Sequence, residues 1–210
     1  MTQVVIATHN PHKVAELQRI LGSALEGIEL LTYDGPEPIE DGDTFEANAL
    51  IKARAAAEHT GLPAIADDSG ISVEALDGAP GIHSARYAGT RDDGDNLRLL
   101  LTNLGSSTDR RASFVCAAAL VVPPSLEEVG PDGPAESVTA DEYVELATWP
   151  GAVLTEPAGE GGFGYDPIFR PDGSDRSAAE LTVDEKDDVS HRSQAFRALA
   201  PRIAALATAD

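Results

Sequence analysis

The sequence has few lysines, a single cysteine and no long apolar run. Lys13, Lys52 and Lys186 are its only lysines, and the 210 residues carry a formal net charge of −21. Such a chain lacks the basic footprint that nucleic-acid binding requires, and it is repelled by anionic membranes. We therefore expect no nucleic-acid partner and no membrane partner. The excess of acid is best explained as a solvated surface.

The single cysteine excludes an intrachain disulfide, which is consistent with a reducing cytoplasm. Cys116 lies in an alternating apolar pattern, so we interpret it as a small core residue rather than a nucleophile. The start of the chain has no signal-peptide pattern. No apolar run approaches the roughly 18 residues of a membrane-spanning helix. We expect a cytoplasmic protein.

Apolar periodicity predicts strands that alternate with helices, which is typical of an α/β protein. The expected antiparallel part covers residues 111–155, and a solvated, acidic excursion occupies residues 123–140. A proline at position 201 is expected to kink or end the last helix. The expected strands are 3–7, 28–32, 111–122, 143–148 and 152–155, and the expected helices are 11–21, 44–59, 93–104 and a last one that begins after residue 190.

Two adjacent carboxylates form the most unusual stretch of the chain. Asp67 and Asp68 follow a short apolar run and precede Ser69 and Gly70. This pattern predicts the end of a buried strand, a tight turn and a second strand that starts at Ile71. Carboxylates at such a place are costly unless a positive group meets them. Hard oxygen ligands suit Mg²⁺, so the pattern indicates a magnesium site.

The first predicted strand leads into a helix with favourable start signals. Asn10 is a good N-cap and Pro11 suits the first helical position. Free backbone N–H groups and Lys13 at this point favour phosphate binding. An ordinary strand-to-helix connection has the same features, so that reading stays open. The following loop, residues 34–43, contains several acids, and the residues alone favour none of them as a metal ligand.

Two further passages carry candidate binding residues. The glycine-rich passage 159–167 holds Phe163 and Tyr165, which suits either base stacking or simple packing of the rings. His191 and Arg192 begin the last helix, where an arginine opposes the helix dipole. They indicate an anionic or keto-oxygen partner, or else a surface pair. The phosphate-loop motif is missing, and no GxGxxG motif opens the first predicted helix, which disfavours both of those nucleotide sites. A nucleotide with Mg²⁺ fits the whole set.

Five passages, VIATHNPHK (5–13), EDGDTFEANALIKA (40–53), AIADDSGISVEALDGAPGIHSARYAG (64–89), WPGAVLTEPAGEGGFGYDPIF (149–169) and AELTVDEKDDVSHR (179–192), span almost the whole chain. In this order they resemble the inosine triphosphate pyrophosphatase family, the dITP/XTP pyrophosphatases. The resemblance implies one domain over residues 1–210, with an elongated mixed central sheet flanked by helices and two lobes around a nucleotide cleft. It also implies a cytoplasmic homodimer.

The resemblance further implies Mg²⁺-dependent hydrolysis of noncanonical purine nucleoside triphosphates (ITP, dITP, XTP) to the monophosphate and pyrophosphate. Glu40 and Asp68 would be metal ligands, and Asp68 also the proton acceptor, with Asp67 in support. Two departures stand out, because many members have glycine at the position of His9 and an acid at that of Ala47. The implied substrate-binding residues are Thr8, His9, Asn10, Pro11, His12, Lys13, Ser69, Phe163, Gly164, Tyr165, Asp166, Lys186, His191 and Arg192.

Two alternatives remain beside this function. The chain could be a pyrophosphatase for another nucleotide class, such as modified pyrimidines, or a nucleotide-binding protein without catalytic activity. Loss of the carboxylates or of Lys13 would indicate the second alternative, and all of them are present.

Overall fold

The structure is a computed structural model that describes residues 1–124 and 140–208. Most of the expected excursion at 123–140, and the side chain of His12, lie outside the described residues. The strands are β1 (Thr2–Ile6), β2 (Ile28–Thr32), β3 (Ala64–Val73), β4 (Arg111–Val122), β5 (Asp141–Val153) and β6 (Phe169–Pro171). The α-helices are α1 (Pro11–Leu21), α2 (Phe45–Thr60), α3 (Asp93–Leu104), α4 (Val183–Val189) and α5 (His191–Ala205).

The six strands form a mixed sheet in the order β2-β1-β3-β4-β5-β6. Strand β1 pairs in parallel with β2 and with β3, and Val5 lies opposite Leu31 and Ala64. The last pair, β5 and β6, is antiparallel, with Val153 opposite Phe169. A mixed sheet with helices confirms the expected α/β class.

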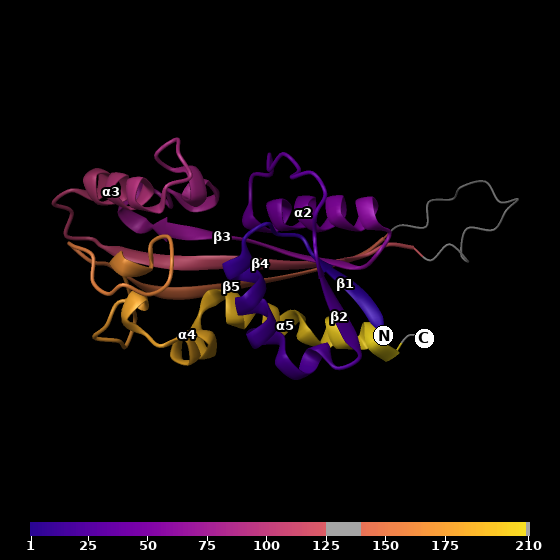
Figure 1. The fold of residues 1–210 in the computed structure, drawn as a ribbon. Coiled ribbons are helices and arrows are strands. Elements are labelled where there is room, and N and C mark those ends of the chain that lie inside the picture. Colours follow the sequence, from indigo (N-terminus) through magenta and orange to yellow (C-terminus); the bar gives the residue numbers. More distant parts are fainter. Residues whose placement is uncertain (125–139, 209–210) are drawn as a thin grey trace, which may run out of the picture. The chain divides into compact units, whose positions relative to one another are not determined.

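The described residues group into two compact units. The first is drawn from Met1–Asp67, Ala117–Glu145 and Ala195–Asp210, and the second from Asp68–Cys116 and Leu146–Gln194. In the first unit, α2 lies on one face of the strands, and α1 with the end of α5 lies on the other (Figure 1). The buried face of α2 is made of alanines, which let the helix approach the strands closely. These alanines are Ala49, Ala53, Ala56 and Ala57.

The second unit has a larger and more aromatic core. Helix α3 covers one face of its strands and α4 lies on the other (Figure 1). Leu97, Leu100 and Leu104 recur at helical spacing on α3 and are all buried. The ring of Phe169 lies 4.5 Å from that of Phe114 and 5.4 Å from that of Trp149, in tilted arrangements that aromatic rings favour.

Local signals account for several element boundaries. Helix α2 begins after Thr44, whose side chain accepts a hydrogen bond from the Ala47 N–H, and it ends at Gly61 in a left-handed conformation. Ser190 accepts a hydrogen bond from the Ser193 N–H at the start of α5. The expected ranges 28–32, 93–104 and 111–122 match β2, α3 and β4.

The expected turn at the two central aspartates is wrong. Strand β3 continues from Ala64 to Val73 through the polar residues. Gly70 sits in a strand because a neighbour approaches it closely: a Cβ there would lie 2.3 Å from the Ser84 Oγ and 2.4 Å from the Gly81 oxygen. Close packing against a distant segment, rather than a turn, explains this glycine.

Two other expectations also need correction. Strand β5 runs without a turn through Trp149–Gly151, because Gly151 lies against the backbone oxygen of Arg170 in the paired strand β6. No expectation covered the charged stretch before Ser190, which forms the helix α4 and starts with a capping box between Thr182 and Glu185. Helix α5 continues through Pro201, so the expected end there is wrong. Within the described residues, no helix has the length and hydropathy to cross a membrane.

Candidate functional site

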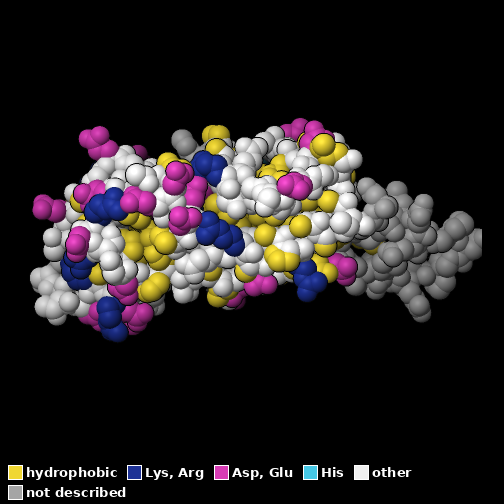
Figure 2. All heavy atoms as spheres, turned by 90° about the horizontal axis from the view of Figure 1, so that it is seen from below, with side chains coloured by type: hydrophobic (Ala, Val, Ile, Leu, Met, Phe, Trp, Pro, Cys, Tyr) yellow, Lys and Arg dark blue, Asp and Glu magenta, His cyan; other side chains and the backbone are white. Residues whose placement is uncertain are grey.

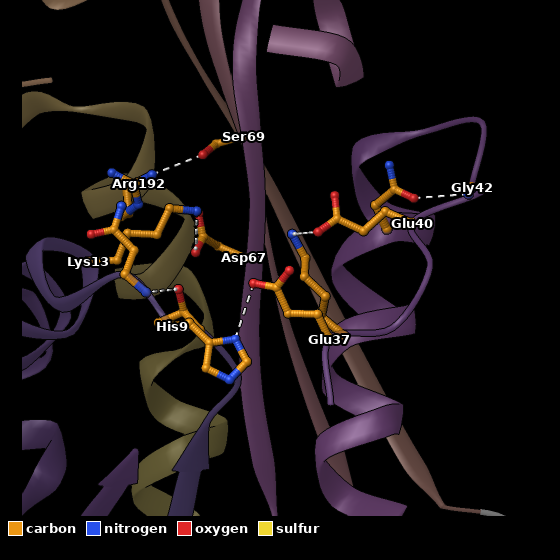
Figure 3. A network of polar contacts seen from close by, with 12 residues as sticks. His9, Lys13, Glu37, Glu40, Gly42, Asp67, Ser69 and Arg192 are labelled. Atoms are coloured by element: carbon orange, nitrogen blue, oxygen red, sulfur yellow. Dashed lines mark hydrogen bonds and ion pairs between the residues drawn. The ribbon is translucent and has the colours of Figure 1, made fainter. Parts of the chain in front are cut away.

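Lys13 and Asp67 form the central ion pair of the first unit. The two oxygens of Asp67 accept hydrogen bonds of 3.1 and 2.9 Å from the Lys13 Nζ. The Asp67 side chain is 2% exposed and that of Lys13 is 18% exposed. Lys13 comes from the first turn of α1, and Asp67 from β3 (Figure 3). A lysine therefore supplies the positive group that the sequence required at Asp67.

The loop between β1 and α1 is tied to its surroundings by short polar contacts. The Thr8 Oγ1 accepts a hydrogen bond from the Asn10 N–H at 3.2 Å. The His9 ring contacts the Glu37 carboxylate at 3.2 Å, which joins this loop to the one before α2 (Figure 3). The predicted phosphate-binding stretch, residues 8–13, thus includes the N-terminus of α1.

Glu40 lies in the acidic loop and contacts a lysine of α2. The Lys52 Nζ is 3.3 Å from the Glu40 Oε1, and both side chains are largely buried. The same loop is held by Asn48, a fully buried residue whose Oδ1 accepts the Gly42 N–H at 2.9 Å (Figure 3). Glu40 is therefore a positioned carboxylate and not a freely solvated one.

Asp68 stands next to Asp67 on β3 and is 8% exposed. Because side chains alternate along a strand, Asp68 and Asp67 point to opposite faces, while Ser69 shares the face of Asp67. The two aspartates are accordingly unequal: one holds Lys13 and the other is directed elsewhere. Among the described residues, no group of three or more His, Cys, Asp and Glu side chains is arranged to hold a metal ion.

Arg192 is the main buried cation of the second unit. The residue is 2% exposed, and its guanidinium donates a hydrogen bond of 2.9 Å from Nη2 to the Ser69 Oγ. The guanidinium carbon lies 5.5 Å from the centre of the Phe163 ring, and the Lys186 Nζ lies 5.1 Å from it. Two cations therefore flank one aromatic ring.

The glycine-rich passage 159–167, called the aromatic loop below, is held in place by a buried carboxylate. Asp166 is 2% exposed and accepts the Phe163 N–H at 2.9 Å. It also contacts the Lys186 Nζ. Gly162 permits this arrangement, since a Cβ there would lie 2.1 Å from the Asp166 Oδ2. The Phe163 ring thus projects from a backbone whose conformation is restrained by the Asp166 carboxylate.

Two further contacts hold the same loop. The buried Tyr165 hydroxyl donates a 2.8 Å hydrogen bond to the Ser84 oxygen, and the Asp93 Oδ2 accepts the Gly164 N–H at 2.8 Å. Burial, followed by the nearby Tyr87 and Asp93, raises the pKa of the Tyr165 hydroxyl. Tyr165 therefore stays protonated at neutral pH and remains a donor.

His191 is part of the aromatic core. Its ring is stacked on Phe114 with the centroids 4.8 Å apart and an interplanar angle of 8°, and Trp149 lies at 6.3 Å. The residue is 5% exposed. Packing of this kind places the start of α5, and with it the neighbouring Arg192.

Each of the three lysines forms an ion pair with an acidic residue that the sequence analysis assigned to the site or gave a supporting role beside it. The partners of Lys13, Lys52 and Lys186 are Asp67, Glu40 and Asp166. On the face shown in Figure 2, the Lys and Arg side chains of the described residues form separate patches, most with Asp or Glu side chains close by. Such pairs suit an anionic ligand with a divalent cation, because phosphate can take the lysines and the metal the carboxylates.

Sequence reasoning did not assign three residues that the structure connects to the candidate site. Lys52 had one signal, the scarcity of lysine, but its contact with Glu40 depends on the fold of the loop. Asp93 resembles an ordinary acid in the first turn of a helix. Ser84 has no local signal, since its contacts to β3 and to Tyr165 join segments 13 and 81 residues apart in the chain.

The fold and these contacts define an α/β protein with lysine–carboxylate pairs and a braced aromatic loop. The sequence profile of the Ham1 family matches residues 4–202. Because this match covers most of the chain, the chain belongs to the Ham1 family.

Curated and solved relatives agree with this assignment. The chain is 51% identical over 209 residues to the dITP/XTP pyrophosphatase of Leifsonia xyli, covering 98% of each sequence. It is 48% identical over 208 residues to the dITP/XTP pyrophosphatase of Streptomyces coelicolor, covering 96% of each. A solved Ham1 protein from Coxiella burnetii is 40% identical with a TM-score of 0.82, covering 97% of this chain and 98% of that one. The family resemblance expected from the five passages is confirmed.

Proposed function

We propose that this protein hydrolyses noncanonical purine nucleoside triphosphates, such as ITP, dITP and XTP, to the monophosphate and pyrophosphate. The observation that carries the proposal is the 51% identity, over nearly the whole length of both chains, to a relative named dITP/XTP pyrophosphatase. The retained lysines, carboxylates and aromatic loop supply the chemistry that such a reaction needs.

We assign binding of the triphosphate to the loop that leads into α1. The N–H groups of the first helical turn are free of intrahelical partners, and they favour negative charge. Lys13 lies in that turn and is held by Asp67. On our proposal, residues 8–13 bind the phosphates, and Lys13 exchanges part of its contact with Asp67 for phosphate oxygens.

Glu40 and Asp68 are the residues that we propose to hold Mg²⁺. Both present hard carboxylate oxygens. Mg²⁺ is commonly held by one or two carboxylates plus substrate phosphates, which is the kind of site that these two residues would form with a bound triphosphate. When bound, the ion would neutralise phosphate charge at the reacting centre.

Asp68 is the proposed general base. Its carboxylate would accept the proton of a water molecule that attacks the α-phosphorus. A new oxygen–phosphorus bond forms, the bond from the α-phosphorus to the bridging oxygen breaks, and pyrophosphate leaves. The near-complete burial of Asp68 limits the water around it, which favours a fixed geometry.

We assign binding of the purine base to the aromatic loop of the second unit. Phe163 would stack a purine, and Arg192, whose guanidinium carbon lies 5.5 Å from the centre of that ring, or a backbone N–H would donate to a 6-keto oxygen. Adenine presents a donor at that position instead, which leaves a buried donor unpaired at a cost of about 1–3 kcal/mol. This difference would favour ITP over ATP. Ser69, Gly164, Tyr165, Asp166, Lys186 and His191 complete the proposed nucleoside-binding set.

We also propose that residues 1–210 act as one catalytic domain, because the family match spans both compact units. The resemblance to the inosine triphosphate pyrophosphatases supports a homodimer in the cytoplasm. The single buried cysteine is consistent with that compartment. Light scattering of the purified protein tests the dimer.

The function is tested by measuring pyrophosphate release with Mg²⁺ from ITP, dITP, XTP, GTP, ATP and pyrimidine triphosphates. We expect efficient release from the first three and much slower release from ATP. A preference for a pyrimidine would assign the protein to another nucleotide class. Binding of nucleotides without any release would identify it as a nucleotide-binding protein.

A further inference from the structure

Two consecutive backbone N–H groups in the aromatic loop are each capped by a carboxylate from a different element. The Phe163 N–H is bound by Asp166, which lies three residues further along the same loop. The Gly164 N–H is bound by Asp93, which lies 71 residues earlier in the chain. The peptide that carries the Phe163 ring is therefore fixed by one local and one distant acceptor.

The loop depends on such acceptors because its own backbone is permissive. Gly162 and Gly164, which flank Phe163, have φ angles of +71° and +62°. Glycine adopts this region at little cost but also leaves it easily. A Cβ at Gly164 would point into open space, with no atom within 4 Å. The hydrogen bond to Asp93 restrains the Gly164 N–H directly.

Asp93 is not required to cap its own helix. The N-cap of α3 is Asp92, whose Oδ1 accepts the Asp95 N–H at 2.8 Å. Asp93 is the first residue inside the helix, and its Oδ2 is directed to the loop. Helix α3 is itself anchored through buried leucines such as Leu97 and Leu100, so the acceptor sits on a rigid element.

We propose that Asp93 is a positioning residue for base recognition, which fixes the Phe163–Gly164 peptide and so sets the ring that stacks the purine. This inference rests on the proposed function. Asp93 touches neither the phosphates nor the base on this account, and it acts only through the loop. Loss of its acceptor should weaken recognition of the nucleoside part and leave recognition of the phosphates intact.

The test compares Asp93→Ala with Asp93→Asn. The alanine variant loses the acceptor, and we expect its KM for ITP to rise about three- to tenfold, as for one lost hydrogen bond. The inhibition constant of inorganic tripolyphosphate, which has no base, should stay within twofold of the wild type. The asparagine variant keeps an Oδ1 acceptor and should restore the KM for ITP to within twofold.

Asp92→Ala is the matched control, because it removes a carboxylate of the same helix start without touching the loop. We expect it to lower the melting temperature and to leave the KM for ITP unchanged. An unchanged KM in Asp93→Ala would overturn the inference. So would an equal loss of tripolyphosphate inhibition, or a failure of Asp93→Asn to restore the KM.

The proposed function is judged separately, by turnover of ITP in the wild type. If the wild type shows no turnover, calorimetric binding of IMP to the wild type and to Asp93→Ala replaces the kinetic comparison. Weaker binding in the variant supports the positioning role. Equal binding in both, or no binding in either, contradicts it.

Discussion

The proposed phosphate region around Lys13 and the proposed base region around Phe163 are built on different principles. The first relies on charge: a lysine on a helix start faces a buried carboxylate, at 2.9 Å. The second relies on shape: a glycine-rich backbone is held by acceptors from α3, from the segment of Ser84 and from the loop itself. Each can be damaged without the other.

On the proposed function, the two regions contribute differently to substrate recognition. Charge pairs attract any triphosphate and give little choice among bases. A fixed ring with a donor beside it discriminates between bases, because a misplaced or unpaired polar group is costly in a buried site. Substitutions near Lys13 should therefore change catalysis or stability, and substitutions near Phe163 should change selectivity.

The largest effect is expected at the proposed base. Asp68→Asn keeps the size of the side chain and removes its ability to accept a proton at neutral pH. We expect turnover of ITP to fall by about 10²–10⁴-fold, while binding of the nucleotide remains measurable by calorimetry. Turnover at the wild-type rate would remove Asp68 from this role.

The next effect concerns stability in the charge region. Lys13→Met leaves Asp67 buried without its lysine, and urea unfolding should show a loss of about 3–5 kcal/mol. The double variant Lys13→Met/Asp67→Asn should regain most of the stability but not the activity. Lys52→Met is the comparison, since its partner Glu40 is more exposed and the loss should be smaller. Equal losses of unfolding free energy in Lys13→Met and Lys52→Met would show that burial of the partner carboxylate does not set the size of the loss.

Selectivity should change when the donor beside the ring is removed. Arg192→Ala is expected to reduce the preference for ITP over ATP by about tenfold, as the loss of one donor to a keto oxygen predicts. The ratio of kcat/KM for the two substrates is the measurement. Should the ratio stay the same, base recognition lies elsewhere in the molecule.

The smallest effect is expected at an exposed ion pair between Arg176 and Glu185 of α4. The Arg176 guanidinium, together with the Thr182 N–H, lowers the pKa of the Glu185 carboxyl to about 2 from an ordinary value of 4.5. A lowered pKa in the folded state stabilises the fold above pH 4.5, and this contribution disappears as the pH falls from 4.5 to about 2. Arg176→Ala should raise the pKa part of the way to 4.5 in an NMR titration, with little change of melting temperature at neutral pH. A pKa that does not move would show that the Thr182 N–H alone sets it.

Sequence reasoning went furthest where local signals decide the structure. Asn10 and Pro11 indicated the helix start that carries Lys13, and leucine spacing predicted α3 to the residue. It failed where distant segments meet. Gly70 was interpreted as part of a turn, but it lies in β3 because Ser84 packs on it. The roles of Asp93 and Lys52 likewise depend on partners that no local pattern reveals.

The resemblance assigned site residues that physical reasoning alone left open, and the structure gives several of them supporting contacts. Tyr165 and Asp166 were expected to line a nucleoside pocket. Both are buried and bonded to the protein itself, to Ser84 in one case and to Phe163 in the other. Their role in substrate binding stays a prediction, and the contacts indicate that they act by holding the loop.

The position of the bond that breaks tests the account most directly. ITP is hydrolysed in water labelled with heavy oxygen, and the products are examined by mass spectrometry. Attack at the α-phosphorus, with Asp68 as base, predicts label in IMP and none in pyrophosphate. Label in pyrophosphate, or release of inorganic phosphate with IDP, would contradict the proposed reaction.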